Sequence, residues 1–233
     1  MKKTISADAL KWVALITMFI DHIGAVIIEH APMYPQDGRL LAADYVLRYT
    51  GRLAFPIFCF LLVEGFGHTR SKIKYFKNLA LFAVISEIPF DLANCGELSF
   101  EKQNVFFTLA AGYLSIWALE YFTSKKKKFF IENYATEGII IFLVLAVLAE
   151  LTHTDYGMLG VALIVVLWGF REERRLQCIF GSLVLWMEIT HVFAFLMIYF
   201  YNGVRKMKRG KYFFYAFYPL HLLLLYGIFV LLW

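Results

Sequence analysis

The feature that most constrains this chain is a series of long apolar stretches separated by short polar connectors. A helix needs about 20 apolar residues to cross a bilayer, and roughly 17 is the lower limit. Hydrophobic residues make up 61% of the chain, well above the share of about half that is usual in soluble domains. The pattern predicts an all-α, polytopic transmembrane helical bundle in which residues 1–233 form a single domain. The candidate segments are Leu10–Glu29, Thr50–Phe66, Phe76–Leu92, Val105–Phe122, Gly138–Leu151, Tyr156–Phe170, Leu176–Tyr201 and Tyr212–Trp233.

Lysine and arginine set the expected orientation of these segments. The intervening connectors Ala31–Arg48, Ala93–Asn104 and Thr152–Asp155, which we interpret as loops, contain few of them. Because cytoplasmic loops carry the excess of positive charge, this alternation predicts a cytoplasmic N-terminus. The basic runs flank apolar segments, and we therefore expect membrane lipids, and no nucleic acid, as their partners. Most of the 23 Lys and Arg lie in five clusters, at residues 2–3, 70–77, 125–128, 171–175 and 205–211.

The stretch Leu176–Tyr201 decides whether the chain has eight or nine segments. As one crossing it gives eight, but it then places the basic cluster at 205–211 outside. As a helical hairpin that turns near Met187–His191 it gives nine, with two short arms, and returns that cluster to the cytoplasm. We follow the charge distribution and predict nine segments with an external C-terminus.

Charged residues interrupt the first apolar stretch. A titratable side chain at the centre of a membrane helix costs at least about 2.5–3.5 kcal/mol, and it is therefore a functional candidate. Lys11 and His22 are eleven residues apart, which places them within about 20° of each other around a helix and about 16 Å apart along it. One face thus offers a cation and a deeper imidazole to a long ligand with an anionic head. Alternatively, Lys11 is a lysine that extends its ammonium group to the membrane interface and binds no ligand. Asp21 points about 100° away and should pair with another helix.

The later stretches carry further polar candidates. Arg52 either holds a ligand carboxylate or phosphate or pairs with Asp21 or Asp91, and the sequence favours neither. Glu87 and Asp91 share one helix face at i, i+4, with Pro89 between them. The other candidates are Glu64, Asn104, His153, Asp155, Tyr156, Tyr218 and His221.

Several function classes lack their motifs here. The sequence contains no Walker lysine loop, dinucleotide-binding glycine fingerprint or Gly-x-Ser-x-Gly elbow. Its single Glu-x-x-His, at Glu188 and His191, is half of what a di-metal bundle needs, so we expect no metal. Intramembrane transferases and proton-coupled transporters of small metabolites both use buried His, Asp, Glu and Arg, and a non-enzymatic scaffold is a third alternative. A transporter usually has two related halves with broken helices, which the sequence does not display.

Six blocks of the sequence resemble, in order, the TraX family of integral membrane acyltransferases, which is associated with N-acetylation of conjugative pilin. The resemblance covers nearly the whole chain and is weakest between Val161 and Ile189. More distantly, the chain is similar to membrane acyltransferases that modify cell-surface glycans, in which a basic residue lies eleven positions before a catalytic histidine. Lys11 and His22 match this spacing, with Lys where Arg is usual. The blocks are LKWVALITMFIDHIGAVI, GRLAFPIFCFLLVEGF, ISEIPFDL, QNVFFTLAAG, HTDYG and FYAFYPLHLLLLY.

The resemblance implies an acyl-CoA-dependent O- or N-acyltransferase of the bacterial inner membrane, with acetyl-CoA as the expected donor on the cytoplasmic side. It implies that His22 is the general base, acting on the acceptor directly or through an acyl-histidine intermediate. Lys11, with Arg70 and Lys72, would hold the donor phosphates. The acceptor would be a peptide N-terminus, a sugar or a small amine. Its side of the site would be lined by Asp21, Arg52, Glu87, Asp91 and His153.

Overall fold

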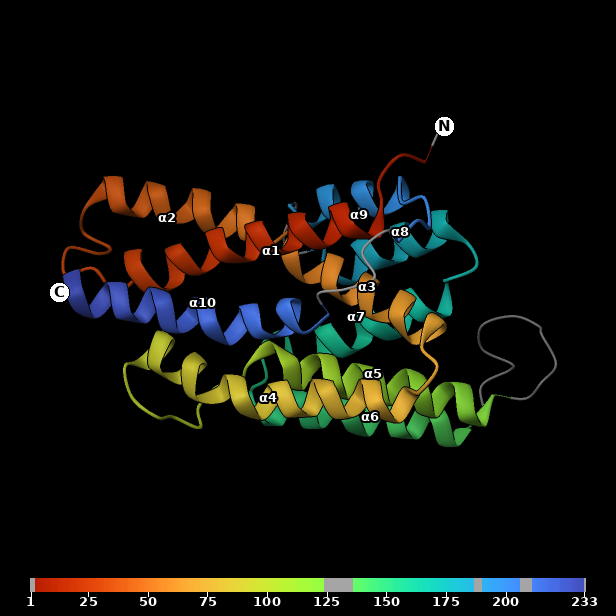
Figure 1. Ribbon diagram of the computed structural model, residues 1–233. Coiled ribbons are helices and arrows are strands. Elements are labelled where there is room, and N and C mark those ends of the chain that lie inside the picture. Colours follow the sequence, from red (N-terminus) through yellow and green to blue (C-terminus); the bar gives the residue numbers. More distant parts are fainter. Residues whose placement is uncertain (1–2, 124–135, 187–189, 206–210, 233) are drawn as a thin grey trace. The chain divides into compact units, whose positions relative to one another are not determined.

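The computed structural model describes residues 3–123, 136–186, 190–205 and 211–232 (Figure 1). Within these ranges the regular structure is helical, with two isolated bridges and no strand, which confirms the predicted all-α class. The predicted KKKK connector and the centre of the predicted turn near Met187–His191 lie outside the described residues. The elements are α1 (Ala7–Ile23), the π-helix η1 (Gly24–Ile28), α2 (Gly38–Gly51), α3 (Ala54–His68), α4 (Lys72–Cys95), α5 (Val105–Phe122), α6 (Thr136–Leu151), α7 (Gly157–Gly169), α8 (Arg174–Val184), α9 (His191–Tyr199) and α10 (Lys211–Leu232).

The helices identify a multi-pass membrane protein. Among the described residues, five helices are long and apolar enough to cross a bilayer. α6 and α7 are apolar but shorter, and the count of eight or nine segments stays a prediction. The five candidate spans are Ala7–Ile28, Gly38–His68, Lys72–Cys95, Val105–Phe122 and Tyr212–Leu232.

The interpretation of Ala31–Arg48 as a loop is wrong, because α2 occupies most of it. Asp37 caps this helix, and its side chain accepts a hydrogen bond from the Arg39 N–H at 2.8 Å. Charged residues lower the hydropathy of α2 and hide it from a search for apolar runs. The helix ends at Gly51, and Pro56 then lies in the first turn of α3, where its missing N–H breaks no helical hydrogen bond.

The expected interruption of Leu176–Tyr201 is present. The stretch forms two short helices, α8 and α9, with non-helical residues between them. The chain forms two compact units. Unit 1 comprises Met1–Phe58, Ile85–Ser99 and Trp186–Trp233, and unit 2 comprises Cys59–Val84 and Phe100–Leu185.

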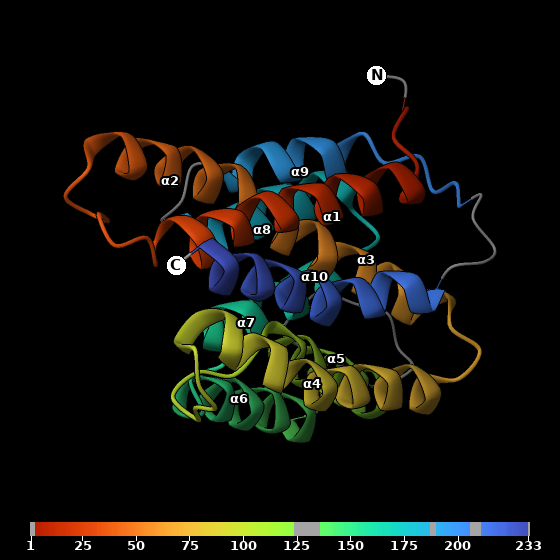
Figure 2. The ribbon, with the colours of Figure 1, turned by 60° about the vertical axis from the view of Figure 1, so that its left-hand side comes forward.

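In unit 1, α1 and α10 lie side by side and run in the same direction (Figures 1 and 2). Ring contacts fix this register, because residue numbers rise together on both helices: Trp12 packs on Phe214 with centroids 5.8 Å apart, and Phe19 packs on Phe217 at 6.3 Å. The segments that lead into the two helices also pair, with the Asn202 N–H donating to the Ile5 carbonyl at 2.8 Å.

The contact of α1 and η1 with α2 is close because both sides use glycine. Gly51 of α2 lies against the Asp21 side chain with no room for a Cβ atom. A Cβ atom at Gly24 would lie 3.0 Å from side-chain atoms of Asp44 and Arg48. Polar side chains of the two helices therefore meet at short range.

In unit 2, α5, α6 and α7 pack together, and α5 and α6 lie side by side in both views (Figures 1 and 2). Small residues allow this, since Ala146, Ala149 and Val161 form a buried cluster and Gly112 of α5 lies against Ile164 of α7. The first turn of α4 lies at the last turns of α5, where Lys72 forms an ion pair with Glu120. The start of α5 is therefore at the opposite end of this packing.

Candidate functional site

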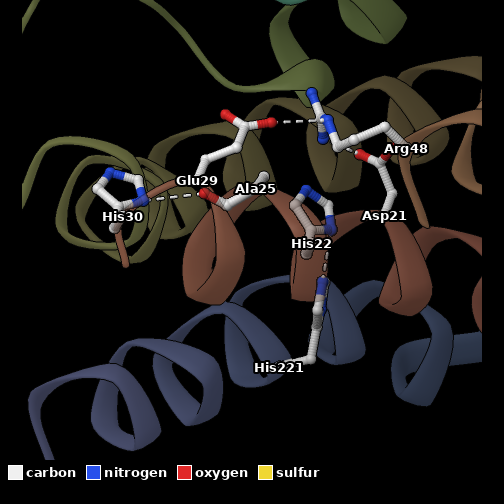
Figure 3. A network of polar contacts seen from close by, with 7 residues as sticks. All are labelled: Asp21, His22, Ala25, Glu29, His30, Arg48 and His221. Atoms are coloured by element: carbon white, nitrogen blue, oxygen red, sulfur yellow. Dashed lines mark hydrogen bonds and ion pairs between the residues drawn. The ribbon is translucent and has the colours of Figure 1, made fainter. Parts of the chain in front are cut away.

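Two histidines from the ends of the sequence meet in unit 1 (Figure 3). His22 Nδ1 lies 2.9 Å from His221 Nε2, and His221 Nδ1 lies 2.7 Å from the Phe217 carbonyl oxygen. A carbonyl oxygen only accepts, so His221 Nδ1 is the donor in that bond. Neutral His221 then carries its lone pair on Nε2 and accepts the Nδ1–H of His22. The hydrogen-bond partners thus assign the His22 lone pair to Nε2.

The His22 ring is held in place while Nε2 is left available. His221 is buried and stacks on the Phe217 ring at 4.9 Å, with 18° between the planes. Tyr218 packs edge-on against His22 at 5.8 Å. The hydrogen bond between the two histidines engages Nδ1 of His22 and not Nε2. An imidazole with a fixed tautomer and an available lone pair can act as a general base or a nucleophile.

Asp21 faces α2, as its 100° offset from His22 predicted. Its Oδ2 lies 2.6 Å from Arg48 Nη1, and Arg48 Nε lies 3.1 Å from Glu29 Oε1 (Figure 3). One guanidinium thus joins two carboxylates and ties both ends of the stretch of residues 21–29 to α2. The pairing of Asp21 with another helix is confirmed. Arg48 was missed because its segment was interpreted as a loop, and Glu29 was taken only as the end of the first apolar segment.

His30, also missed from the sequence, joins two helix ends. Its Nδ1 lies 2.9 Å from the Ala25 carbonyl oxygen, and its Nε2 lies 2.9 Å from the Asn94 carbonyl oxygen near the end of α4. Since both partners are acceptors, the two hydrogen bonds form together only when both ring nitrogens carry a proton.

Lys11 and His22 face the same neighbouring helix, which confirms the predicted shared face. Lys11 Nζ lies 5.3 Å from the Phe214 ring centroid and 3.9 Å from Asp8 Oδ1. Between the levels of Lys11 and His22, the Phe19 ring packs on Phe217. A ligand that reaches from one residue to the other must pass beside these rings.

The other candidates of unit 1 lie on α2 and α4. Arg52 is half-buried, and its N–H donates to the Arg48 carbonyl at 3.1 Å. Asp91 is buried and accepts a hydrogen bond from the Ser99 N–H at 3.1 Å, so it stabilises the connector after α4. Glu87 lies one turn earlier and is half-buried. α4 continues through Pro89.

Most candidates of unit 2 have structural contacts. Asn104 caps α5 by accepting from the Phe106 N–H at 3.0 Å, and it donates to the Ala83 carbonyl at 2.8 Å. Glu64 pairs with Arg174 at 3.3 Å. Lys72 pairs with Glu120, and Arg70 is exposed. Asn104 thus has the capping role that amides at helix starts often have.

The structure brings His153, Asp155 and Tyr156 together in the connector between α6 and α7. His153 and Tyr156 have positive φ angles, 51° and 66°. The Asp155 N–H donates to the Gln103 carbonyl at 2.8 Å. Lys72 lies at the other end of α5 from the connector with His153, so the candidates of unit 2 do not form one site.

Comparison with known proteins supports the resemblance found in the sequence. The family model described as TraX protein matches residues 6–229. A probable fimbrial assembly protein FimC, serogroup H1, from Dichelobacter nodosus is 31% identical over 250 residues, which cover 94% of each chain. An uncharacterized protein from Rickettsia prowazekii (strain Madrid E) is 24% identical over 196 residues, covering 84% of this chain and 68% of that protein. No solved structure matches. The chain belongs to the TraX family.

Proposed function

We propose that this protein is a bacterial inner-membrane acyltransferase that moves an acetyl group from acetyl-CoA to an amine or hydroxyl of a component used in fimbrial assembly. The observation that carries the proposal is the hydrogen-bonded series Phe217 C=O, His221 and His22, which leaves the His22 Nε2 lone pair available. The acceptor class is suggested by the fimbrial assembly relative.

In the proposed reaction, His22 Nε2 takes the proton of the acceptor N–H or O–H while the acceptor lone pair attacks the thioester carbonyl carbon. The carbon–sulfur bond then breaks, and the departing thiolate of coenzyme A takes the proton from Nε2. His221 acts as a positioning residue, because its Nε2 accepts the Nδ1–H of His22 in both protonation states. This arrangement holds the ring without supplying a negative charge, unlike a carboxylate partner.

The donor phosphates are assigned to the end of α1 that carries Lys11. Arg205 is close enough to Lys11 for their positive charges to interact, so this end of unit 1 has two cations that could bind phosphate. Lysine offers a point charge where arginine would form a forked contact. Arg70 and Lys72 stay candidates in unit 2, although Lys72 already pairs with Glu120.

The test compares His22→Gln with His68→Gln, a change at an exposed histidine at the end of α3. Fimbrial subunits from cells that express each variant are analysed for an added acetyl group by mass spectrometry. We expect the modification to disappear with His22→Gln and to persist with His68→Gln, at equal amounts of folded protein. Persistence of the modification in His22→Gln would overturn the base assignment.

Variants at His221 and Lys11 distinguish a role in positioning His22 from a role in binding the donor. We expect His221→Phe to lower kcat by about 10- to 100-fold, the range seen when the hydrogen-bond partner of a metal-binding histidine is removed, with little change in donor KM. Lys11→Ala should raise donor KM and leave kcat near the parent value. A raised donor KM in His221→Phe together with a lowered kcat in Lys11→Ala would contradict these roles.

A further inference from the structure

A cavity of about 360 Å³ lies in unit 2, between the connector that precedes α5 and the connector that joins α6 to α7. We call it the connector cavity. Its volume is at the small end of the range of ligand sites, which suits one side chain better than a whole molecule of drug size. Its lining includes Phe100, Gln103, Phe107, Leu151, His153 and Thr154.

Backbone and hydroxyl hydrogen bonds fix both walls of the cavity. The Gln103 N–H donates to the His153 carbonyl at 3.1 Å, and Gln103 forms a parallel bridge with Thr154. The Thr108 hydroxyl, on α5, donates to Thr154 Oγ1 at 3.0 Å and also contacts the Asp155 carbonyl. The walls are thus joined without any ligand.

The wall from the second connector is held in an unfavourable backbone conformation. His153 and Tyr156 have left-handed φ angles, and Gly157 follows with φ of 44°. Non-glycine residues in this region cost about 1–3 kcal/mol each, and such strain concentrates at ligand sites. The His153 side chain is exposed, and among the described residues no hydrogen bond engages its imidazole. An aromatic, polar group is therefore available at the cavity.

The lining combines exposed apolar side chains with polar groups. Phe100 is 90% exposed and Leu151 is 69% exposed, and Phe107 adds a second ring. Phe100 belongs to a connector and not to a membrane-spanning helix, so lipid tails do not explain its exposure. An apolar guest would remove these surfaces from water.

Charge indicates the side of the membrane on which the cavity opens. The opposite end of the same helices carries Arg70, Lys72, Lys74, Arg171, Arg174 and Arg175, whereas the sequence around the cavity carries one cation, Lys102. The positive-inside rule places the cavity outside the cytoplasm. Three carboxylates adjoin the lining residues in sequence, at Glu101, Glu150 and Asp155. The segments that line the cavity therefore carry a net negative charge, which favours a cationic guest and opposes the anionic headgroups of lipids.

We propose that the connector cavity binds one apolar side chain of an extracytoplasmic peptide whose neighbouring amine is attracted by the net negative charge of the segments that line it. The apolar walls, the small volume, the excess of carboxylates and the expected side of the membrane all fit such a guest. The inference rests on the proposed function only in treating the peptide as the acetyl acceptor, because binding itself needs no acyl donor.

The experiment measures binding of Phe-Gly-Gly-amide, Gly-Gly-Gly-amide and N-acetyl-Phe-Gly-Gly-amide to the full-length protein in nanodiscs. We expect the first peptide to bind, and the loss of either the ring or the amine charge to weaken binding. Phe100→Ser should weaken it about tenfold, the change that corresponds to one aromatic contact. Leu98→Ser is the matched control, because Leu98 is an exposed apolar residue of the same connector outside the lining.

The outcomes separate this inference from the proposed function. His22→Gln should bind Phe-Gly-Gly-amide as the parent does. If acetyl transfer is lost while this binding is normal, the result bears on the proposed function and not on the peptide site. Equal affinity of Phe100→Ser and Leu98→Ser would overturn the inference even where transfer depends on His22. A photoreactive benzoylphenylalanine in place of Phe must cross-link to the 100–107 or 151–154 segment. Cross-linking elsewhere, or occupation of the cavity by phospholipid that the peptide does not displace, would also overturn it.

Discussion

The site around His22 and the connector cavity are held by different kinds of interaction. In unit 1, Arg48 joins two carboxylates and His221 fixes an imidazole, so side-chain charge and protonation determine the geometry. In unit 2, backbone groups and the Thr108 hydroxyl join the walls. The first arrangement suits a group that must exchange a proton, and the second suits a cavity that must keep its shape. Substitutions should therefore affect the two units by different amounts and in different places.

The largest expected effect is that of Arg48→Met. Removing the guanidinium leaves the carboxylates of Asp21 and Glu29 without this partner, which should cost about 3–5 kcal/mol of stability because the group is partly buried. We expect a lower thermal midpoint in detergent and faster hydrogen exchange in α1 and α2. Arg39→Met, at an exposed residue in the first turn of α2, is the control. Equal effects of the two changes, or equally faster exchange in α5–α7, would break the comparison between units.

A smaller effect is expected at the close contact between α1 and α2. Gly51→Ala places a methyl group against Asp21 and should destabilise by about 1–3 kcal/mol through overpacking. Gly227→Ala, in α10, meets nothing within 4 Å and should stabilise by about 0.5–1 kcal/mol through helix propensity. Opposite shifts in thermal midpoint are the expected result. A shift of the thermal midpoint in the same direction in both variants would show that the close contact with Asp21 does not restrict the size of the residue at position 51.

The smallest destabilisation is expected at Thr108. Thr108→Val removes the hydroxyl and leaves the Asp155 carbonyl and Thr154 with one partner fewer, at a cost of about 1–2 kcal/mol. Hydrogen exchange should become faster at residues 152–157 and stay unchanged in α1 and α2, and Thr108→Ser should restore the parent rates. If Thr108→Ser exchanges as fast as Thr108→Val, methyl packing and not the hydroxyl joins the walls.

The sequence predicted most helices because length and hydropathy suffice to find apolar segments. It also predicted that Lys11 and His22 share a face and that Asp21 points elsewhere, since both follow from 100° per residue. It missed α2, whose buried face carries Asp44 and whose other charges resemble those of a loop.

The pairing in the site could not be predicted in the same way. His22 and His221 are 199 residues apart, and only the packing of α10 on α1 brings them together. His221 was a candidate, but no rule of spacing assigns it a partner at that distance. The left-handed backbone at Tyr156 carries no sequence signal either, because tyrosine rarely adopts it.

The parallel packing of the first and last helices has a consequence for where the chain's two ends lie. A polypeptide that crosses a membrane twice in the same direction must cross it an odd number of times in between. Its passages then sum to an odd total, and its ends emerge into different compartments. A fluorescent reporter that responds to its compartment should therefore fluoresce at the carboxyl end under conditions in which the same reporter at the amino end does not.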